Sequence, residues 1–327
     1  MKILIRAEGG HTIGMGHVMR MLVLADKLRP FADVVFVCRD NEELRAGVDH
    51  IKACGYNVLR IDGAKLACEL AGIAGDCLIT DSYNVDEGYF DNTKEIFDYT
   101  GYMDDLNKYR INADFIINQN INAEDLEYKA GKGTRFFMGT RYVLLREEFT
   151  NLPIRNVRNS LQDILITLGG ADPKNLSETV TIKLSKAFPE LRFHIVVGPS
   201  FTHEDSLKKI AGGNILLHHN PKMSELMQEC DAAISACGST IYELCACGTP
   251  IVGIVTADNQ VMAACKMNSI GALKYAEGLE KVVQNLKSLD YETRVRMSET
   301  GQGLVDGYGS TRLAGEIRKI ICNKTYR

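Results

Sequence analysis

The sequence has little or none of several features that mark particular protein classes. It contains no tryptophan and only 7 prolines in 327 residues. It has no run of 18 or more apolar residues and no charged-then-apolar leader, so we expect a cytoplasmic protein without a membrane span. The formal net charge is only −4. A chain of this charge has no broad electrostatic attraction to nucleic acid or to an anionic membrane.

The ten cysteines include no C-x-x-C pair, so the sequence predicts neither a zinc ribbon nor a thioredoxin-like redox motif. Most of them lie in apolar stretches such as VVFVC (34–38) and IYELCACG (241–248). Cys245 and Cys247 are two residues apart in a stretch that we expect to be helical, where such positions do not share a face. We therefore expect free, buried, reduced thiols, no metal site and no cofactor.

What is present is an alternation of apolar runs and amphipathic segments along the whole chain. The expected strands of the first half lie at 2–7, 33–38, 57–61, 76–81, 100–103, 114–118 and 135–139, and those of the second half at 162–170, 192–198, 214–219, 231–236 and 250–255. Strands that alternate with helices favour parallel sheets. The length suits two domains, and the polar stretch TNLPIRNVRNS (150–160) interrupts the pattern.

The predicted fold class is therefore α/β, with two Rossmann-like domains facing a cleft. The N-terminal domain is expected at 1–149, the linker at 150–159 and the C-terminal domain at 160–327. The chain from about residue 277 is expected to be mostly helical and charged. We expect its closing helix to pack back on the N-terminal domain.

A short glycine loop, GMGHVMR (14–20), follows the first expected strand. Gly14 and Gly16 permit a positive φ and a tight turn. The dinucleotide fingerprint needs a third glycine, but position 19 is methionine, which disfavours nicotinamide binding. In open α/β sheets ligands bind beyond the carboxyl ends of the strands. The loop is thus placed to deliver a side chain to a ligand.

That side chain is His17, expected at the first position of a helix. The positive end of a helix disfavours a second proton on the imidazole, so we expect a neutral ring that is suited to act as a general base. The alternative is that His17 only caps the helix or packs on the loop. Arg20 lies one turn further on, where it either steers an anion or is solvated.

Acidic and amide side chains follow later strands of the first half. Asp81 and Tyr83 belong to TDSY (80–83), Asp104 and Asp105 to MDDL (103–106), and the amides to INQN (117–120). Asp81 either lines the site or caps the next helix, whereas a phenol at Tyr83 can orient a hydroxyl or a water. Because sugars need many paired donors and acceptors, this edge is predicted to be a sugar site.

The second half presents two glycine turns. Gly169 and Gly170 follow a strand and open a helix, which is typical either of a phosphate cradle or of a plain turn. The stretch Gly238-Ser239-Thr240 also follows a strand and is expected to bind a diphosphate. Glu243 lies four residues beyond Ser239, so the two share a helix face, where a carboxylate can accept both hydroxyls of a ribose. Asn259 and Gln260 follow the next strand on the same side.

The succession of GST, a glutamate three residues on, GTP and DNQ over 238–260 resembles the nucleotide half of GT-B glycosyltransferases, above all the MurG-like group. The stretches IRAEGGHTIGMGHVMR, TDSY, MDD, INQN, RYVLLREEF and LGGADPKNLS resemble the UDP-sugar hydrolases of pseudaminic acid biosynthesis, the PseG family. This resemblance runs from residue 1 to about residue 275, and nothing specific resembles the tail.

The resemblance implies a MurG-like GT-B fold that hydrolyses UDP-2,4-diacetamido-2,4,6-trideoxy-β-L-altropyranose to UDP and the free sugar, for nonulosonic acids of surface or flagellar glycans. It implies that His17 is the general base, that Tyr83 and Asn259 are the matching tyrosine and asparagine of the site, that Glu243 binds ribose, and that Ser239 binds phosphate. Water attacking opposite UDP predicts anomeric inversion without a metal. The alternatives are a glycosyltransferase with another acceptor and a UDP-sugar-binding protein without turnover.

Overall fold

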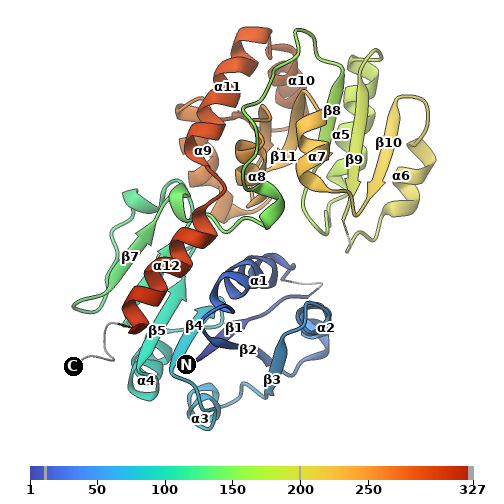
Figure 1. Cartoon of the computed structure of the whole chain (residues 1–327). Helices are drawn as coiled ribbons and strands as arrows, with labels where there is room; N and C mark the ends of the chain where they lie inside the picture. Colours follow the sequence, from blue (N-terminus) through green and yellow to red (C-terminus); the bar gives the residue numbers. More distant parts are fainter. Residues whose placement is uncertain (11–12, 199, 323–327) are drawn as a thin grey trace. The chain divides into compact units, whose positions relative to one another are not determined.

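The computed structural model describes residues 1–10, 13–198 and 200–322, and the chain divides into two compact units (Figure 1). The first unit comprises Met1–Leu144 and the segment that begins at Tyr308, and the second comprises Leu145–Gly307. The predicted linker 150–159 thus lies inside the second unit. The closing segment, which the sequence analysis counted with the C-terminal domain, belongs to the first unit.

The sheet of the first unit has seven parallel strands in the order β3-β2-β1-β4-β5-β6-β7. Their bounds are β1 Lys2–Ala7, β2 Asp33–Arg39, β3 Asn57–Ile61, β4 Cys77–Asp81, β5 Tyr99–Met103, β6 Phe115–Asn118 and β7 Arg135–Met138. The strand order reverses between β1 and β4, which is the topological switch point where open α/β sheets bind ligands.

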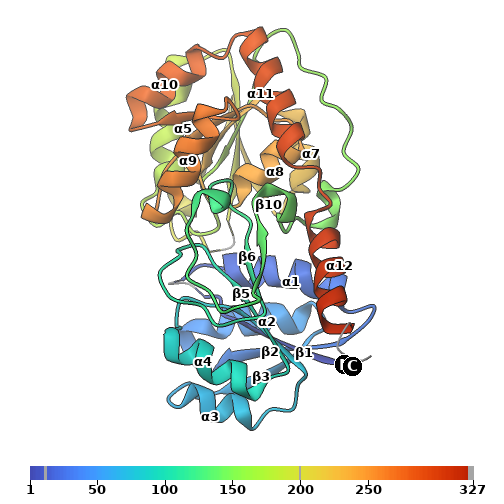
Figure 2. The same ribbon diagram turned by 90° about the vertical axis from the view of Figure 1, so that its left-hand side faces the viewer.

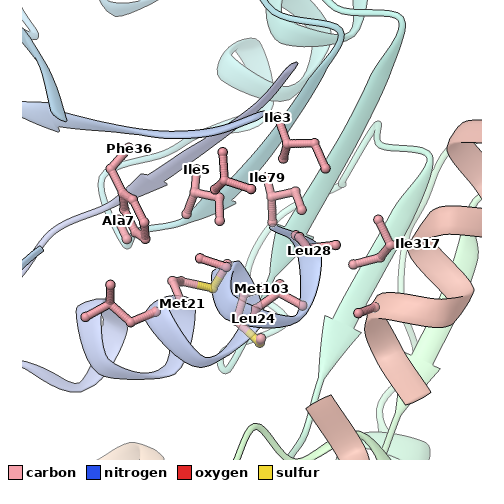
Figure 3. Packing of buried hydrophobic residues seen from close by; sticks show 14 of the residues in the cluster. Ile3, Ile5, Ala7, Met21, Leu24, Leu28, Phe36, Ile79, Met103 and Ile317 are labelled. Atoms are coloured by element: carbon pink, nitrogen blue, oxygen red, sulfur yellow. The ribbon is translucent and has the colours of Figure 1, made fainter. Parts of the chain in front are cut away.

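The apolar strands have helices on both faces because alternate side chains point to opposite sides. Ile3 and Ile5 of β1 face α1 (Gly16–Leu28), where Met21 and Leu24 are fully buried (Figure 3). Leu4 points to the other face, in a cluster with residues of α4 (Glu87–Ile96). The other helical segments of this part are α2 Arg45–Ala53, α3 Leu66–Ala71 and the 3-10 turns η1 Glu42–Leu44, η2 Ala123–Asp125 and η3 Thr140–Tyr142.

The closing helix α12 (Gly309–Cys322) packs against α1 although the two are nearly three hundred residues apart in sequence (Figures 1 and 2). Leu313, Ile317 and Ile321 recur every four residues on one face and are buried in the same core cluster as α1. Arg312 also donates to the Arg141 carbonyl oxygen. These contacts are the physical reason why the closing segment belongs to the first unit.

The second unit has a six-stranded parallel sheet in the order β10-β9-β8-β11-β12-β13, with helices around it (Figure 2). The strands are β8 Asp163–Thr167, β9 Arg192–Val197, β10 Ile215–His219, β11 Ala232–Ala236, β12 Ile251–Ile254 and β13 Lys274–Ala276. The helical segments are α5 Leu176–Ala187, α6 Glu204–Ile210, α7 Met223–Glu229, α8 Thr240–Ala246, α9 Val261–Ser269, α10 Leu279–Lys287, α11 Tyr291–Leu304, η4 Glu147–Phe149 and η5 Asp258–Gln260. The sequence analysis had no strand at β13.

The stretch predicted as a linker is fixed to the second unit by an arginine. The Arg155 guanidinium donates to the Thr249 hydroxyl at 3.0 Å, to the Met227 carbonyl at 3.1 Å and to the Cys230 carbonyl. These contacts tie Arg155 to the end of α7 and to the residues that precede β11 and β12.

All ten cysteines are free thiols, as expected, but they are not all buried. Cys54, Cys68, Cys265 and Cys322 are exposed, which corrects the expectation for these four. Within residues 1–10, 13–198 and 200–322, no helix is both long and apolar enough to cross a membrane.

Candidate active site and nucleotide site

The glycine loop of the first unit leads directly into α1. Gly14 has a φ of +75°, and its carbonyl oxygen accepts the Gly10 amide at 3.1 Å. Gly16, the first residue of α1, does not adopt a positive φ, so only Gly14 uses the freedom that the sequence analysis assigned to both. His17 is the second residue of the helix, and only 8% of its surface is exposed.

His17 is oriented by Asp81, which ends β4. The imidazole Nδ1 lies 2.6 Å from Oδ1 of Asp81. An ionised carboxylate can only accept, so Nδ1 donates in this hydrogen bond and Nε2 is the ring nitrogen that does not contact Asp81. Asp81 does not cap the following helix, because Asp86 caps α4 through the Tyr89 amide. His17 is therefore more than a cap: it is half of a histidine–aspartate pair.

Arg20 lies next to this pair and binds the Asp81 carboxylate. Its Nε and Nη2 donate to the two oxygens of Asp81, each at 2.6 Å, and its Nη1 and Nη2 donate to Asp105 at 3.0 and 2.8 Å. Burial alone would raise the pKa of Asp81, but Arg20 and His17 outweigh it and hold that pKa well below its usual range. Arg20 is thus neither solvated nor free to steer an anion.

Tyr83 completes the cluster on its open side. Its hydroxyl donates to Asp105 at 3.1 Å, and its ring meets the His17 ring edge-on, with 4.6 Å between centroids. Burial, together with the Asp105 carboxylate, raises the pKa of Tyr83, so the hydroxyl keeps its proton. Asp105 also accepts from the Asn120 amide at 3.3 Å. The structure thus brings together five of the predicted site residues, namely His17, Arg20, Asp81, Tyr83 and Asp105.

Other polar groups of this edge are engaged within the protein. Asp104 is buried and accepts from the Leu106 and Asn107 amides and from the Tyr128 hydroxyl. The side-chain oxygen of Gln119 accepts the Leu144 amide. These groups shape the loops that follow β5 and β6, so the predicted collection of sugar-binding groups is smaller than the sequence indicated.

A second buried ion pair lies at the same edge and was missed in the sequence. Glu8, directly after β1, accepts two hydrogen bonds from Arg39 at 2.6 and 2.8 Å and one from the Ser82 hydroxyl at 3.3 Å. Only 3% of Glu8 is exposed. The sequence does carry a signal for Glu8, because an acidic residue that directly follows a strand lies at the ligand-binding edge of the sheet.

In the second unit, β11 leads through Gly238 and Ser239 into α8, which begins at Thr240. A Cβ atom on Gly238 would lie 3.7 Å from the Gln260 amide nitrogen, so these two predicted residues are neighbours. Gln260 also accepts the Thr256 amide at 2.9 Å, which fixes the turn after β12. Asn259 lies exposed on η5 beside it.

Glu243 lies one turn into α8 and pairs with an arginine that the sequence analysis did not single out. Arg146 Nη2 donates to its Oε1 at 3.2 Å. Burial raises the pKa of Glu243, and the Arg146 charge opposes that shift. The Glu243 side chain is 18% exposed.

The Gly169–Gly170 turn has fewer backbone amides for binding an anion than its sequence indicated. Gly169 adopts a φ of +94°, as a tight turn requires. However, the Asp172 carboxylate already accepts the amides of Leu176 and Ser177 at the start of α5, at 2.9 and 2.7 Å. A phosphate at that helix end would meet a carboxylate, so only the loop amides of Gly169 and Gly170 are left as candidates. Among the described residues, no three histidine, cysteine or acidic side chains are grouped to hold a metal ion.

Two parallel-sheet α/β units with these strand orders define a GT-B fold, and solved structures agree. MurG of Acinetobacter baumannii superposes with a TM-score of 0.68 at 15% identity, over 98% of this chain and 100% of that one. The UDP-GlcNAc 2-epimerase of Neisseria meningitidis, bound to UDP-GlcNAc, superposes with a TM-score of 0.60 at 13% identity, over 98% and 100%. The predicted MurG-like fold is confirmed.

No family model matches the chain. The predicted resemblance to UDP-sugar hydrolases is nevertheless confirmed by individual proteins. The chain is 28% identical to the pseudaminic acid cytidylyltransferase and UDP-2,4-diacetamido-2,4,6-trideoxy-β-L-altropyranose hydrolase of Helicobacter pylori, over 94% of this chain and 60% of that protein. It is 27% identical to the Campylobacter jejuni hydrolase of that UDP-sugar, over 74% of this chain and 87% of that protein.

An uncharacterized protein of Methanocaldococcus jannaschii is 29% identical over 81% of this chain and 57% of its own length. The chain therefore spans 57 to 60% of the length of two of these relatives.

Proposed function

We propose that this protein hydrolyses a UDP-sugar of the diacetamido-trideoxy-hexose class to UDP and the free sugar, in pseudaminic acid biosynthesis. The substrate is inferred to be UDP-2,4-diacetamido-2,4,6-trideoxy-β-L-altropyranose, from the relatives named for its hydrolysis. The observation that carries the proposal is the pair of His17 and Asp81, because binding of UDP alone needs no oriented base.

In the proposed reaction, Nε2 of His17 takes a proton from a water molecule as that water attacks the anomeric carbon. The bond between that carbon and the β-phosphate oxygen breaks, and its electron pair leaves with UDP. Asp81 stabilises the imidazolium that forms and keeps the ring in the productive tautomer. Because water enters opposite the leaving group, the anomeric centre inverts.

The remaining predicted residues have supporting roles in this proposal. Tyr83 and Asn259 orient the sugar or the water, and Glu243 accepts the ribose hydroxyls. The diphosphate is assigned to the backbone amides and hydroxyls at Gly238, Ser239 and Thr240, with Gln260 beside them. Arg20, Asp81 and Asp105 act on the substrate through His17 and Tyr83, since their charges are paired with one another.

A second candidate is transfer of the sugar to an acceptor other than water, which the GT-B fold of MurG favours. Both candidates are tested by incubating the protein with the UDP-sugar, without acceptor or added metal, and following UDP and the anomeric proton by NMR. Release of UDP with inverted free sugar supports the hydrolase. Binding without turnover would move the assignment to a transferase or a binding protein, and a retained anomeric configuration would refute direct displacement.

A further inference from the structure

A chain of polar contacts within the second unit ends at Glu243. The Ser224 backbone amide donates to Oε2 of Glu148 at 3.1 Å. The other oxygen of Glu148 pairs with Nη1 of Arg146 at 2.7 Å, and Nη2 of Arg146 reaches Glu243 at 3.2 Å. Two partly buried carboxylates, from η4 and α8, therefore share one guanidinium group.

This guanidinium is held in one orientation. Arg146 also lies over the ring of Phe149, with 5.2 Å between the guanidinium carbon and the ring centroid. Phe149 is buried and follows Glu148 directly, so ring and carboxylate belong to the same 3-10 turn, η4. A planar fork bound on two sides keeps its donors in fixed directions. Arg146 can therefore hold the Glu243 carboxylate, which its Nη2 contacts, in a fixed position.

We propose that Arg146, held by Glu148, is a positioning residue that fixes the Glu243 carboxylate for recognition of the two ribose hydroxyls. The inference rests on the proposed function, in which the second unit binds UDP. Arg146 contacts Oε1 of Glu243, and the proposal assigns the other oxygen, Oε2, to the ribose. A vicinal diol is recognised best by a carboxylate that is ionised and fixed in plane, and the contact with the arginine favours both conditions.

The electrostatics explain why the arginine is needed. Glu243 is a desolvated acid with the like charge of Glu148 nearby, and both effects disfavour ionisation. The positive charge of Arg146 opposes both. Without it, Glu243 would favour its protonated form or a different rotamer, and the ribose hydroxyls would lose their fixed acceptor.

The test compares the affinities of UDP and 2′,3′-dideoxy-UDP by calorimetry, because the second ligand lacks both hydroxyls. The unsubstituted protein is expected to prefer UDP by roughly 10- to 100-fold, the range for hydrogen bonds to a charged group. Arg146→Ala and Glu243→Gln should each lose most of this preference, with the dideoxy-UDP affinity changed less than about threefold. The double variant should lose no more than either single variant, since both remove one interaction.

Two further variants separate positioning from folding. Glu148→Gln should lose part of the preference, because it loosens Arg146 without removing it. Arg192→Ala, which removes another arginine–carboxylate pair of the same unit, should leave the preference unchanged. Equal weakening of both ligands by Arg146→Ala would overturn the inference, and so would UDP binding without any preference in the unsubstituted protein. Failure to bind UDP at all would instead overturn the proposed function.

Discussion

The ligand-binding edges of the two sheets present different kinds of side chain. In the first unit, His17, Arg20, Asp81, Tyr83 and Asp105 form one cluster of hydrogen-bonded charged and aromatic groups. In the second unit, the corresponding edge has glycines, hydroxyls and the Gln260 amide, and its charged groups are Glu243 on α8 and the paired Arg146 and Glu148. Catalysis benefits from charges fixed before the reaction, whereas a nucleotide can be bound by neutral donors. The difference favours a division of labour, with chemistry in the first unit and UDP binding in the second.

The proposed difference between the two units is tested most directly by removing the general base, His17. His17→Ala should lower kcat by roughly 10²–10⁴ because a positioned general base is lost. UDP affinity should stay within about threefold of the original, since the second unit is untouched. Steady-state kinetics and calorimetry on the same preparation check both values, and a variant that retains its turnover would return His17 to a structural role.

The next largest effect is expected from Asp81→Asn. The amide keeps the size of the side chain but removes the charge that stabilises the imidazolium, so kcat should fall about 10²-fold, within the range for a lost catalytic group. Asp104→Asn is the matched control, because it changes a buried carboxylate at the same edge that does not contact His17. If both variants lowered kcat equally, the effect would be one of general packing.

Glu243→Ala tests the other side of the comparison. It should weaken UDP binding by roughly 10- to 100-fold, because a charged acceptor is lost. At saturating substrate, kcat should stay within about threefold. Calorimetry with UDP gives the first value and saturation kinetics the second. A large fall in kcat with unchanged UDP affinity would mean that Glu243 takes part in the reaction. That result would contradict the separation of catalysis and UDP binding between the two units.

Tyr83→Phe sharpens the comparison within the first unit. The ring would keep its edge contact with His17, whereas the hydrogen bond to Asp105 would be lost. We expect kcat to fall roughly tenfold, about the worth of one hydrogen bond at a reacting centre. A Tyr83→Ala variant, which also removes the ring, should fall further when measured in the same assay.

The smallest effect concerns stability in acid. The pKa of Asp81 is lowered in the folded state, so its contribution to stability is present above the unfolded value of about 3.9 and is lost as pH falls below it. The midpoint of urea unfolding should therefore fall less between pH 5 and pH 3 in Asp81→Asn than in the unsubstituted protein. An equal fall of the urea midpoint in the two proteins would mean that the Arg20–Asp81 pair does not stabilise the fold.

Much of the fold was predictable because it depends on local pattern. Every strand predicted from an apolar run is present, with ends that differ by a few residues at most. The three-residue strand β13 escaped detection because it is too short to show a period. The return of α12 to the first unit was only an expectation, because nothing in its own pattern says which apolar surface it covers.

The site was predictable as a set of positions but not as a network. That Asp81 ends a strand and that His17 follows one is visible in the sequence, yet their contact joins residues 64 apart. Arg20 has no sequence signal for its two carboxylate partners, because the partners come from β4 and the loop after β5. Arg146 was hidden for the same reason, since its partner Glu243 lies 97 residues away.

Hydrolysis in ¹⁸O-labelled water tests the central claim that water attacks the anomeric carbon. Mass spectrometry of the released UDP is the decisive readout, because the free sugar can exchange its anomeric oxygen with water. The account predicts UDP without label, since the bond between the carbon and the phosphate oxygen breaks. Labelled UDP would show attack at phosphorus, and His17 would then not be the base that activates water at the sugar.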